Sequence, residues 1–249
     1  MYKNERQAEI LAILTRDGYA TVESLSKLMG VSKSSIRRDL ILMEKADLVT
    51  RNYGGVELGV PKGPKRMSFN AQHHRRVEEK RIIAEKAAQL VSEKDIIFLD
   101  QSSVATFLAV ELIKDKKITI VTNNIEILCM DLPYGVTVYS SGGRVSSIRR
   151  CLIGEDVNSV FGRVRADFAF MSAAAIAPDG MIYDNTIEDV TVRDAMMKNA
   201  NKKVFLCDSE QFDTNAGYRQ AHLSAMDYMI CEAECQSKYQ HIAPKVTFL

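Results

Sequence analysis

The apolar positions in the first part of the chain recur with the period of an α-helix. One helix is predicted over residues 4–17, with Gly18 at its end. A second is predicted between a cap at Thr21 and Gly30, and a third follows a cap at Ser32. The apolar positions of these helices are Ile10, Leu11, Ile13 and Leu14; Val22, Leu25 and Leu28; and Ile36, Leu40 and Met43, and the last three form a stripe that is predicted to face a core. Two short helices joined by so tight a turn are typical of a helix-turn-helix.

A hairpin is predicted directly after the third helix. The segment "LVTRNYGGVEL", residues 48–58, contains two short β-prone runs around the turn sequence "NYGG". Three helices and a hairpin make a winged helix-turn-helix domain, which we assign to residues 1–58.

A linker is predicted after this domain. The segment "LGVPKGPKR", residues 58–66, holds two prolines, two glycines and three basic residues, and we place the linker over residues 59–73. A helix follows over roughly residues 75–91, with Ile83, Ala87 and Leu90 on one face.

The rest of the chain alternates between apolar runs of strand length and helical stretches, and with the preceding helix it is assigned to a second domain, residues 74–249. The predicted strands are residues 96–100, 118–122, 136–140, 166–175, 203–207 and 227–231, and the helical stretches lie near 104–114, 124–131 and 187–200. This alternation predicts an α/β domain with a mostly parallel sheet covered on both faces.

The distribution of charge distinguishes the two parts. The whole chain has a net charge of +1. Residues 1–66 hold 12 Lys and Arg against 8 Asp and Glu, a net of +4, and the remaining residues hold 21 against 24, a net of −3. A basic N-terminal part favours a polyanionic partner for that part.

The third predicted helix carries a polar and basic face opposite its apolar stripe. The residues of that face are Lys33, Ser34, Ser35, Arg37 and Arg38. A helix fits the major groove of B-form DNA, where arginine bonds to guanine O6 and N7, and the serines, the lysine and the first N–H groups suit phosphates. Arg51 and Asn52 of the hairpin could reach the DNA backbone or the minor groove beside it.

Other interpretations of this face stay open from the sequence. The arginines could belong to a solvated basic surface, with Asp39 or Glu44 as an ion-pair partner. Arg38 could instead brace Asp39 or the first helix, and Lys33 could be an ordinary surface lysine.

Polar residues follow three predicted strands at their carboxyl ends, where ligands bind in sheets of this kind. They are Asp100, Ser102, Ser103 and Thr106; Thr122 and Asn123; and Gly142 and Gly143, with Arg144, Arg149 or Arg150 as nearby cations. Hydroxyl groups and free N–H groups at a helix N-terminus suit a phosphate, and glycines allow a ligand to approach the backbone. Each loop alone fits ordinary capping and turning equally well, but their convergence on one sheet edge favours an anion site.

Composition argues against several other classes of protein. No apolar run approaches the roughly 20 residues of a membrane span. The five cysteines include no C-x-x-C pair, which favours free thiols in a reducing cytoplasm. A metal- or redox-sensing regulator is a further alternative, but the adjacent His73 and His74 and the scattered cysteines lack metal-ligand spacing. We therefore predict no metal site, cofactor or membrane partner.

The N-terminal part resembles the DeoR family of bacterial transcription regulators. "VSKSSIRRDL", residues 31–40, matches the family's V-S-x-x-[ST]-I-R-R-D-L helix. The wing, residues 51–55, matches the family's Arg-x-His-Gly-Gly with Tyr53 in place of histidine. The resemblance implies DNA binding, and Tyr53 can still donate to a phosphate.

The second part also resembles this family, whose sensor domain resembles ribose-5-phosphate isomerase and binds phosphorylated sugars or related metabolites. The family's D-x-G-[ST]-T-[TV] matches residues 100–103 with Ser102 for glycine and Thr106 displaced. The matches Thr122-Asn123, Gly142-Gly143, Gly154, Gly180 and Glu188 stand intact. The family's D-x-[ST]-K-[FI] appears at Asp208, where Gln211 replaces the lysine. The resemblance therefore adds Gly154, Glu188, Asp208 and Gln211 to the predicted effector site, in which Arg150 is included as the nearby cation.

These observations predict a repressor of a carbohydrate-metabolism operon, controlled by a phosphorylated sugar or polyol and acting as a homo-oligomer, a dimer or a tetramer. The alternative is a sugar-phosphate isomerase with a fused DNA-binding arm, which needs a base such as Glu188 or Asp208. Gln211 in place of lysine removes the candidate electrophile, so the regulator is the favoured interpretation and no catalytic residue is predicted.

Overall fold

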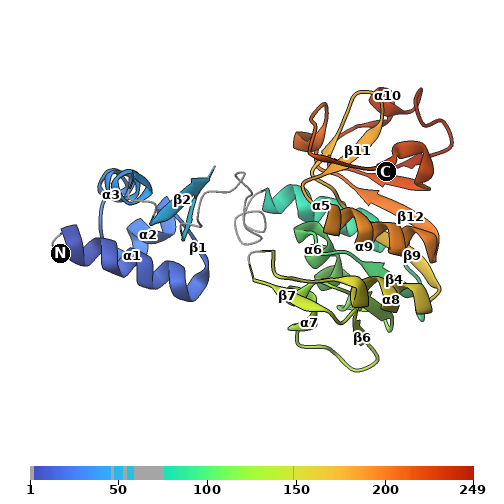
Figure 1. Ribbon diagram of the computed structural model, residues 1–249, viewed down its shortest axis with the longest axis horizontal. Helices are drawn as coiled ribbons and strands as arrows, with labels where there is room; N and C mark the ends of the chain where they lie inside the picture. The colour runs from blue at the N-terminus through green and yellow to red at the C-terminus, as the bar shows by residue number, and fades with distance from the viewer. Residues whose placement is uncertain (1–2, 46–47, 53–54, 59–75, 148) are drawn as a thin grey trace. The chain divides into compact units, whose positions relative to one another are not determined.

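The computed structural model describes residues 3–45, 48–52, 55–58, 76–147 and 149–249. The chain divides into two compact units, Met1–Arg75 and Arg76–Leu249, which are described separately (Figure 1). The predicted linker, residues 59–73, and His73 and His74 lie outside the described residues. The proposed domain limits of 1–58 and 74–249 therefore stay a prediction.

The first unit contains three helices and a three-stranded antiparallel sheet, as a winged helix-turn-helix requires. Its elements are α1 (Lys3–Asp17), β1 (Tyr19–Thr21), α2 (Val22–Met29), α3 (Lys33–Lys45), β2 (Val49–Asn52) and β3 (Gly55–Leu58). The strand order is β1-β3-β2, and Asn52 pairs with Gly55 across the predicted hairpin. The sequence did not predict β1, which adds a third strand to the wing.

The predicted caps fix the turn between α2 and α3. Thr21 and Ser24 form a capping box in which each side chain accepts a hydrogen bond from the other residue's backbone N–H at 2.9 Å. Gly30 ends α2 with φ 62°, a left-handed conformation that favours glycine. The apolar stripe of α3 is buried with α1 and α2, which confirms Ile36, Leu40 and Met43 as core residues.

The second unit is built on a seven-stranded sheet in which every neighbouring pair is parallel. Its strands are β4 (Ile96–Leu99), β5 (Thr119–Thr122), β6 (Thr137–Ser140), β9 (Ala166–Met171), β12 (Ala200–Leu206), β14 (Tyr228–Ile230) and β15 (Thr247–Phe248). The sheet confirms the six predicted strands and adds β15. The predicted run 166–175 is divided, because the chain leaves the sheet after Met171.

Two small antiparallel sheets complete the strands of this unit, and the sequence predicted neither. One is the hairpin of β7 (Arg144–Ser146) and β8 (Cys151–Ile153). The other has the order β10-β11-β13 and consists of β10 (Ala175–Ile176), β11 (Met181–Asp184) and β13 (Tyr218–His222).

Helices cover both faces of the parallel sheet, as predicted. The helices are α5 (Val77–Ala88), α6 (Ser103–Leu112), α7 (Ile125–Leu128), α8 (Glu155–Arg163), α9 (Ile187–Lys198) and α10 (Gln236–Tyr239), with 3-10 helices η1 (Ser209–Gln211) and η2 (Leu223–Ala225). Ile97 and Leu99 pack with α5 and α6, whereas Phe98 packs with α8 and α9 on the opposite face. The sheet therefore separates two apolar cores (Figure 1).

The strand order places a topological switch beside β4. From β4 the chain passes to β5 and β6 on one side and later returns to β9, β12, β14 and β15 on the other. Because loops leave the carboxyl ends of β4 and β9 in opposite directions, ligands in such sheets bind there. This edge is where Asp100 lies.

Candidate functional site

Arg37 and Arg38 lie exposed on α3, and neither forms a hydrogen bond or ion pair with any residue that the structure describes. Both carboxylates that could neutralise them are engaged elsewhere. Asp39 is buried and pairs with Arg6 of α1, and Glu44 pairs with Arg51 at 2.7 Å. The interpretation of these arginines as partners of Asp39 or Glu44 is therefore wrong, and among the described residues neither guanidinium group has a carboxylate partner, so both can bind an external anion.

The pairing of Arg6 with Asp39 joins the first and third helices across 33 residues. Their hydrogen bond raises the pKa of Arg6. Since Asp39 is buried, this contact helps to orient α3 with its arginine face outward. The alternative in which Arg38 braces Asp39 is therefore wrong.

The other predicted DNA-binding residues lie around the same helix. Lys33 Nζ is 2.8 Å from Glu23 Oε1, and the hydroxyls of Ser34 and Ser35 each lie 3.0 Å from Ser32 Oγ. Arg51 and Lys33 are in exposed ion pairs, which contribute little stability and can be exchanged for phosphate contacts. Asn52 ends β2, but its side chain, like the whole of Tyr53, lies outside the described part.

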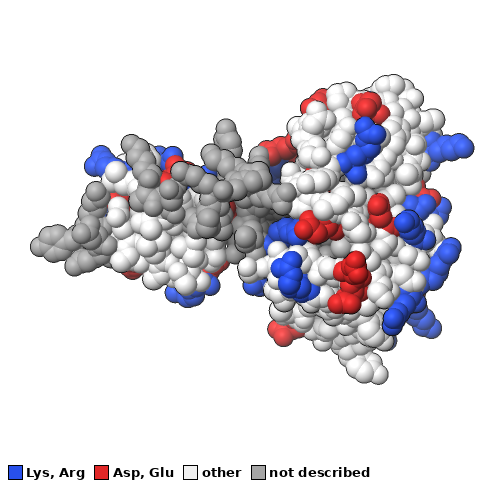
Figure 2. Space-filling model, viewed as in Figure 1, with Lys and Arg blue, Asp and Glu red and all other residues white. Residues whose placement is uncertain are grey.

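The second unit, Arg76–Leu249, does not share the positive net charge of residues 1–66. Figure 2 shows both acidic and basic side chains on its visible face. This agrees with the net charge of −3 outside residues 1–66. Neither this net charge nor the face visible in Figure 2 gives a comparable reason to expect a polyanion.

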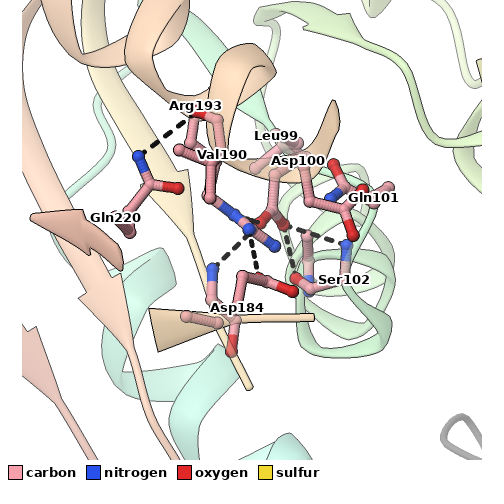
Figure 3. Close-up of polar contacts among 12 residues, drawn as sticks. Leu99, Asp100, Gln101, Ser102, Asp184, Val190, Arg193 and Gln220 are labelled. Carbon is pink, nitrogen blue, oxygen red and sulfur yellow. Dashed lines mark hydrogen bonds and ion pairs between the residues drawn. The ribbon is translucent and has the colours of Figure 1, made fainter. Parts of the chain in front are cut away.

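Asp100 follows β4 and is fully buried at the switch point (Figure 3). Its Oδ1 accepts hydrogen bonds from the backbone N–H of Ser102, at 3.0 Å, and from the Ser102 hydroxyl. Its Oδ2 accepts from the Ser172 N–H at 3.0 Å and from Arg193 Nε at 2.8 Å. These donors come from three different elements, so Asp100 organises the site but presents no free carboxylate oxygen to a ligand.

Arg193, which the sequence reasoning missed, links Asp100 to Asp184 of β11 (Figure 3). Its side chain is only 4% exposed. Burial acts to lower the pKa of Arg193, but Asp184 and Asp100 outweigh it and raise that pKa. Burial raises the pKa of Asp184 against the opposing effect of Arg193. The sequence does contain an indication of this buried charge, because Arg193 interrupts an apolar helical stripe between Val190 and Met196.

The end of β5 joins the same cluster. The Thr122 hydroxyl donates to the Leu99 carbonyl at 2.7 Å and accepts from the Asn124 N–H at 3.0 Å. Asn124 Nδ2 donates to the Thr106 hydroxyl at 3.0 Å, and Ser102 caps α6 by accepting from the Ala105 N–H at 3.2 Å.

The structure thus brings the residues predicted after the first two strands to a single sheet edge. They are Asp100, Ser102, Ser103, Thr106, Thr122 and Asn123. Asp100, Ser102, Thr106 and Thr122 form one hydrogen-bonded group with Asn124 at the N-terminus of α6.

Gln211 reaches this group from the other side of the switch point. Its Nε2 donates to the Ala173 carbonyl at 2.6 Å and to the Ser172 hydroxyl at 3.4 Å, and Ser172 itself donates to Asp100. Asp208 caps η1 and accepts from the Glu210 N–H at 2.9 Å. Burial raises the pKa of Asp208.

The remaining predicted effector residues lie outside this hydrogen-bonded group. Gly142, Gly143 and Gly154 have positive φ angles of 67°, 101° and 119°, and Gly154 is the N-cap of α8. Arg150 pairs with Glu126 of α7 at 2.6 Å. Glu188 is exposed in the first turn of α9. Their assignment to the effector site is an untested prediction.

Arg76, the residue before α5, is the centre of a second ionic cluster that the sequence did not indicate. Its guanidinium lies 2.5 Å from Glu232 Oε1, 3.4 Å from Glu210 Oε1 and 3.5 Å from Glu79 Oε1. Asp208 Oδ1 is 4.0 Å away. Burial opposes protonation, but these carboxylates raise the pKa of Arg76. The cluster ties the start of the sensor unit to η1.

Family models match both units. The model described as "DeoR C terminal sensor domain" matches residues 75–233, and the one described as "DeoR-like helix-turn-helix domain" matches residues 6–60. The chain belongs to the DeoR family. The resemblance noted in the sequence is thereby confirmed, as are the winged domain and the α/β sensor fold.

Curated relatives of this DeoR-family protein are regulators. It is 33% identical to the HTH-type transcriptional regulator GolR of Listeria innocua serovar 6a, over 84% of this chain and 82% of that protein. It is 28% identical to the lactose phosphotransferase system repressor of Staphylococcus aureus NCTC 8325, over 92% of this chain and 93% of that protein. It is 25% identical to the glycerol-3-phosphate regulon repressor of Escherichia coli K12, over 94% of this chain and 92% of that protein.

This DeoR-family protein is therefore a DNA-binding transcriptional regulator, and the isomerase alternative is not supported. Among solved structures, ribose 5-phosphate isomerase A of Methanocaldococcus jannaschii is similar, with a TM-score of 0.39, 18% identity and 53% of each chain covered. Within the described residues, no helix combines the length and apolar character needed to cross a membrane.

Proposed function

We propose that this regulator represses a carbohydrate-metabolism operon by placing α3 in the major groove of operator DNA. The observation that carries the proposal is the pair of exposed arginines, Arg37 and Arg38, whose neighbouring carboxylates already have other partners. A free guanidinium on an exposed helix can bond to guanine or to phosphate without first breaking an ion pair. The names of the repressors among its relatives support the direction of control.

A phosphorylated sugar or polyol is the proposed effector, and the edge of the sensor sheet at Asp100 is its proposed site. The Ser103 and Val104 N–H groups at the start of α6 have no intrahelical acceptors, and the Ser103 hydroxyl lies at the same helix end, whereas the Ser102 hydroxyl already donates to Asp100. This arrangement suits a phosphate, and the surrounding amides and hydroxyls suit a hydroxylated ligand. The relative named for a glycerol-3-phosphate regulon supports the same class.

The protein is proposed to act in the cytoplasm. It is also proposed to be a homo-oligomer, because a helix-turn-helix dimer with two-fold symmetry binds two half-sites of its operator. Their centres are expected about 34–36 Å apart, or a multiple of that distance. The effector would shift the balance between arrangements that fit and do not fit the operator.

A panel of phosphorylated ligands tests the effector assignment. Glycerol 3-phosphate, ribose 5-phosphate, glucose 6-phosphate and galactose 6-phosphate, each with its unphosphorylated parent, are added to the full chain during thermal unfolding. At least one phosphorylated probe is expected to raise Tm, because a ligand at about 100 Kd stabilises the folded state by about 2.7 kcal/mol. The same probe should weaken operator binding about 5–150-fold. A panel in which no probe changes Tm contradicts the assignment.

The Arg76 cluster is the proposed route from the effector site toward the DNA-binding unit. Gln211 contacts Ser172, which donates to Asp100, and η1 carries both Gln211 and Glu210, one of the carboxylates that pair with Arg76. Arg76 directly follows the end of the first unit in the chain. A ligand that displaces η1 would therefore change the anchoring of the segment that leads to the winged domain.

Replacing Arg76 tests this route. Arg76→Ala is expected to keep the ligand-dependent rise in Tm but to lose most of the ligand's effect on operator affinity, measured by fluorescence anisotropy. Arg81→Ala is the matched control, because Arg81 lies on α5, which follows Arg76, and its one ion pair among the described residues is the exposed pair with Glu78. If Arg76→Ala retains the full effect of the ligand on operator affinity, the route is wrong.

A further inference from the structure

Two buried amide side chains at the sensor edge have atoms without hydrogen-bond partners. Gln101 is 7% exposed and Asn123 is 1% exposed. Asn123 Nδ2 donates to Gln101 Oε1 at 3.2 Å and to the Leu152 carbonyl at 3.1 Å. Among the described residues, Gln101 Nε2 has no acceptor and Asn123 Oδ1 has no donor. One bonded pair of amides therefore carries both an unused donor and an unused acceptor.

Rotating either amide by 180° does not remove this deficit. The Leu152 carbonyl accepts from Asn123 and requires the nitrogen of that amide in its present place. With Asn123 fixed, its Nδ2 requires the oxygen of Gln101, because a rotated Gln101 would place two nitrogen donors against each other. The surrounding backbone thus sets the unused donor and acceptor.

Neighbouring groups within the described residues do not satisfy these two atoms. Asp100 precedes Gln101, but its carboxylate binds Ser102, Ser172 and Arg193. The Ser102 hydroxyl donates to Asp100 and accepts from α6. Figure 3 shows Gln101 beside both of these residues. Since nearly all buried polar groups in proteins are paired, an orphan donor and acceptor on one amide pair indicate an external partner.

We propose that Gln101 Nε2 and Asn123 Oδ1 bind hydroxyl groups of the effector and determine its specificity. A hydroxyl group accepts one hydrogen bond and donates another, so it matches this donor and acceptor. The pair lies next to the start of α6, so a ligand whose phosphate occupies that helix end carries its hydroxyls toward Gln101. The inference rests on the proposed function, which places the effector at this edge.

Deoxy analogues provide the test, with isothermal calorimetry on the full chain. The probes are those phosphorylated sugars and polyols above that bind, together with their monodeoxy analogues. For wild type, one monodeoxy analogue is expected to bind at least about tenfold more weakly than its parent, because the amide pair is left without a hydroxyl partner. Gln101→Met should weaken binding of the parent compound by a similar factor. It should also remove most of the preference for the parent over its monodeoxy analogue.

Two further variants separate this effect from other causes. Gln101→Glu keeps the acceptor for Asn123 Nδ2 and removes the Nε2 donor, so it should also lose discrimination between parent and analogue. Gln240→Met, at an exposed amide directly after α10, should behave like wild type. The affinity for inorganic phosphate, measured with wild type and with each variant, reports any effect on the anion site alone.

The outcomes are distinguishable. If probes bind but both Gln101 variants keep the wild-type preference for the parent, the hydroxyl assignment is overturned and the effector site stands. Equal binding of every monodeoxy analogue and its parent to wild type would mean that only water occupies the amide pair, and it also overturns the inference. If no phosphorylated probe binds wild type, the proposed function fails and the inference fails with it.

Discussion

Arg193→Met is expected to lower the free energy of unfolding of the sensor unit by about 3–5 kcal/mol. The substitution leaves Asp100 and Asp184 buried without their shared cation. An uncompensated buried charge costs far more than the loss of one hydrogen bond, and methionine fills much of the arginine volume without supplying a charge. Urea unfolding of the full chain, followed by circular dichroism, measures the change as a lower midpoint of the sensor transition.

Arg150→Met is the matched control for this prediction. Arg150 also pairs with a carboxylate, Glu126, but its side chain is 42% exposed. An exposed pair contributes at most about 1 kcal/mol, so the midpoint should change little. Equal midpoints for the Arg193 and Arg150 variants would show that the buried network does not hold the sensor edge together.

Arg37→Ala is expected to weaken operator binding by about 1–3 kcal/mol, or roughly 5–150-fold, and to relax sequence preference. The loss follows from the exposed position of Arg37 on α3 and from its freedom from carboxylate partners among the described residues. Fluorescence anisotropy with the operator and with a scrambled duplex, at one fixed salt concentration, measures both effects.

Lys33→Ala distinguishes base reading from phosphate contact. Lys33 already pairs with Glu23 and lies at the first turn of α3, where phosphate contacts are expected. Its loss should weaken operator and scrambled duplex alike and reduce the salt dependence of binding. An Arg37→Ala protein with the wild-type ratio of the two affinities would remove Arg37 from base recognition.

The winged domain was predictable because its signals are local. Gly30, with a left-handed backbone, and the stripe of Ile36, Leu40 and Met43 define the turn and the buried face within about twenty residues. The strand β1 was missed, because three residues carry no readable period and the strand that they pair with, β3, lies more than thirty residues away.

The sensor site was predictable only in part. Asp100 and Thr122 follow apolar runs that read as buried strands, so their common edge could be inferred. Arg193 contacts Asp100 across 93 residues, and Arg76 contacts Glu232 across 156. Pairings at such separations are set by the packed fold and leave no spacing pattern in the sequence. The strand β10 was missed because it is only two residues long and carries no readable period.

Footprinting on the DNA upstream of the protein's own gene and neighbouring genes tests the central claim, that α3 reads duplex DNA under control of the sensor unit. The account predicts protected tracts whose centres are about 34–36 Å apart, or a multiple of that distance. Protection should weaken with the phosphorylated probe that raises Tm, and it should require higher concentrations of the Arg37→Ala protein. A wild-type protein that protects no bases with or without any probe would contradict the account.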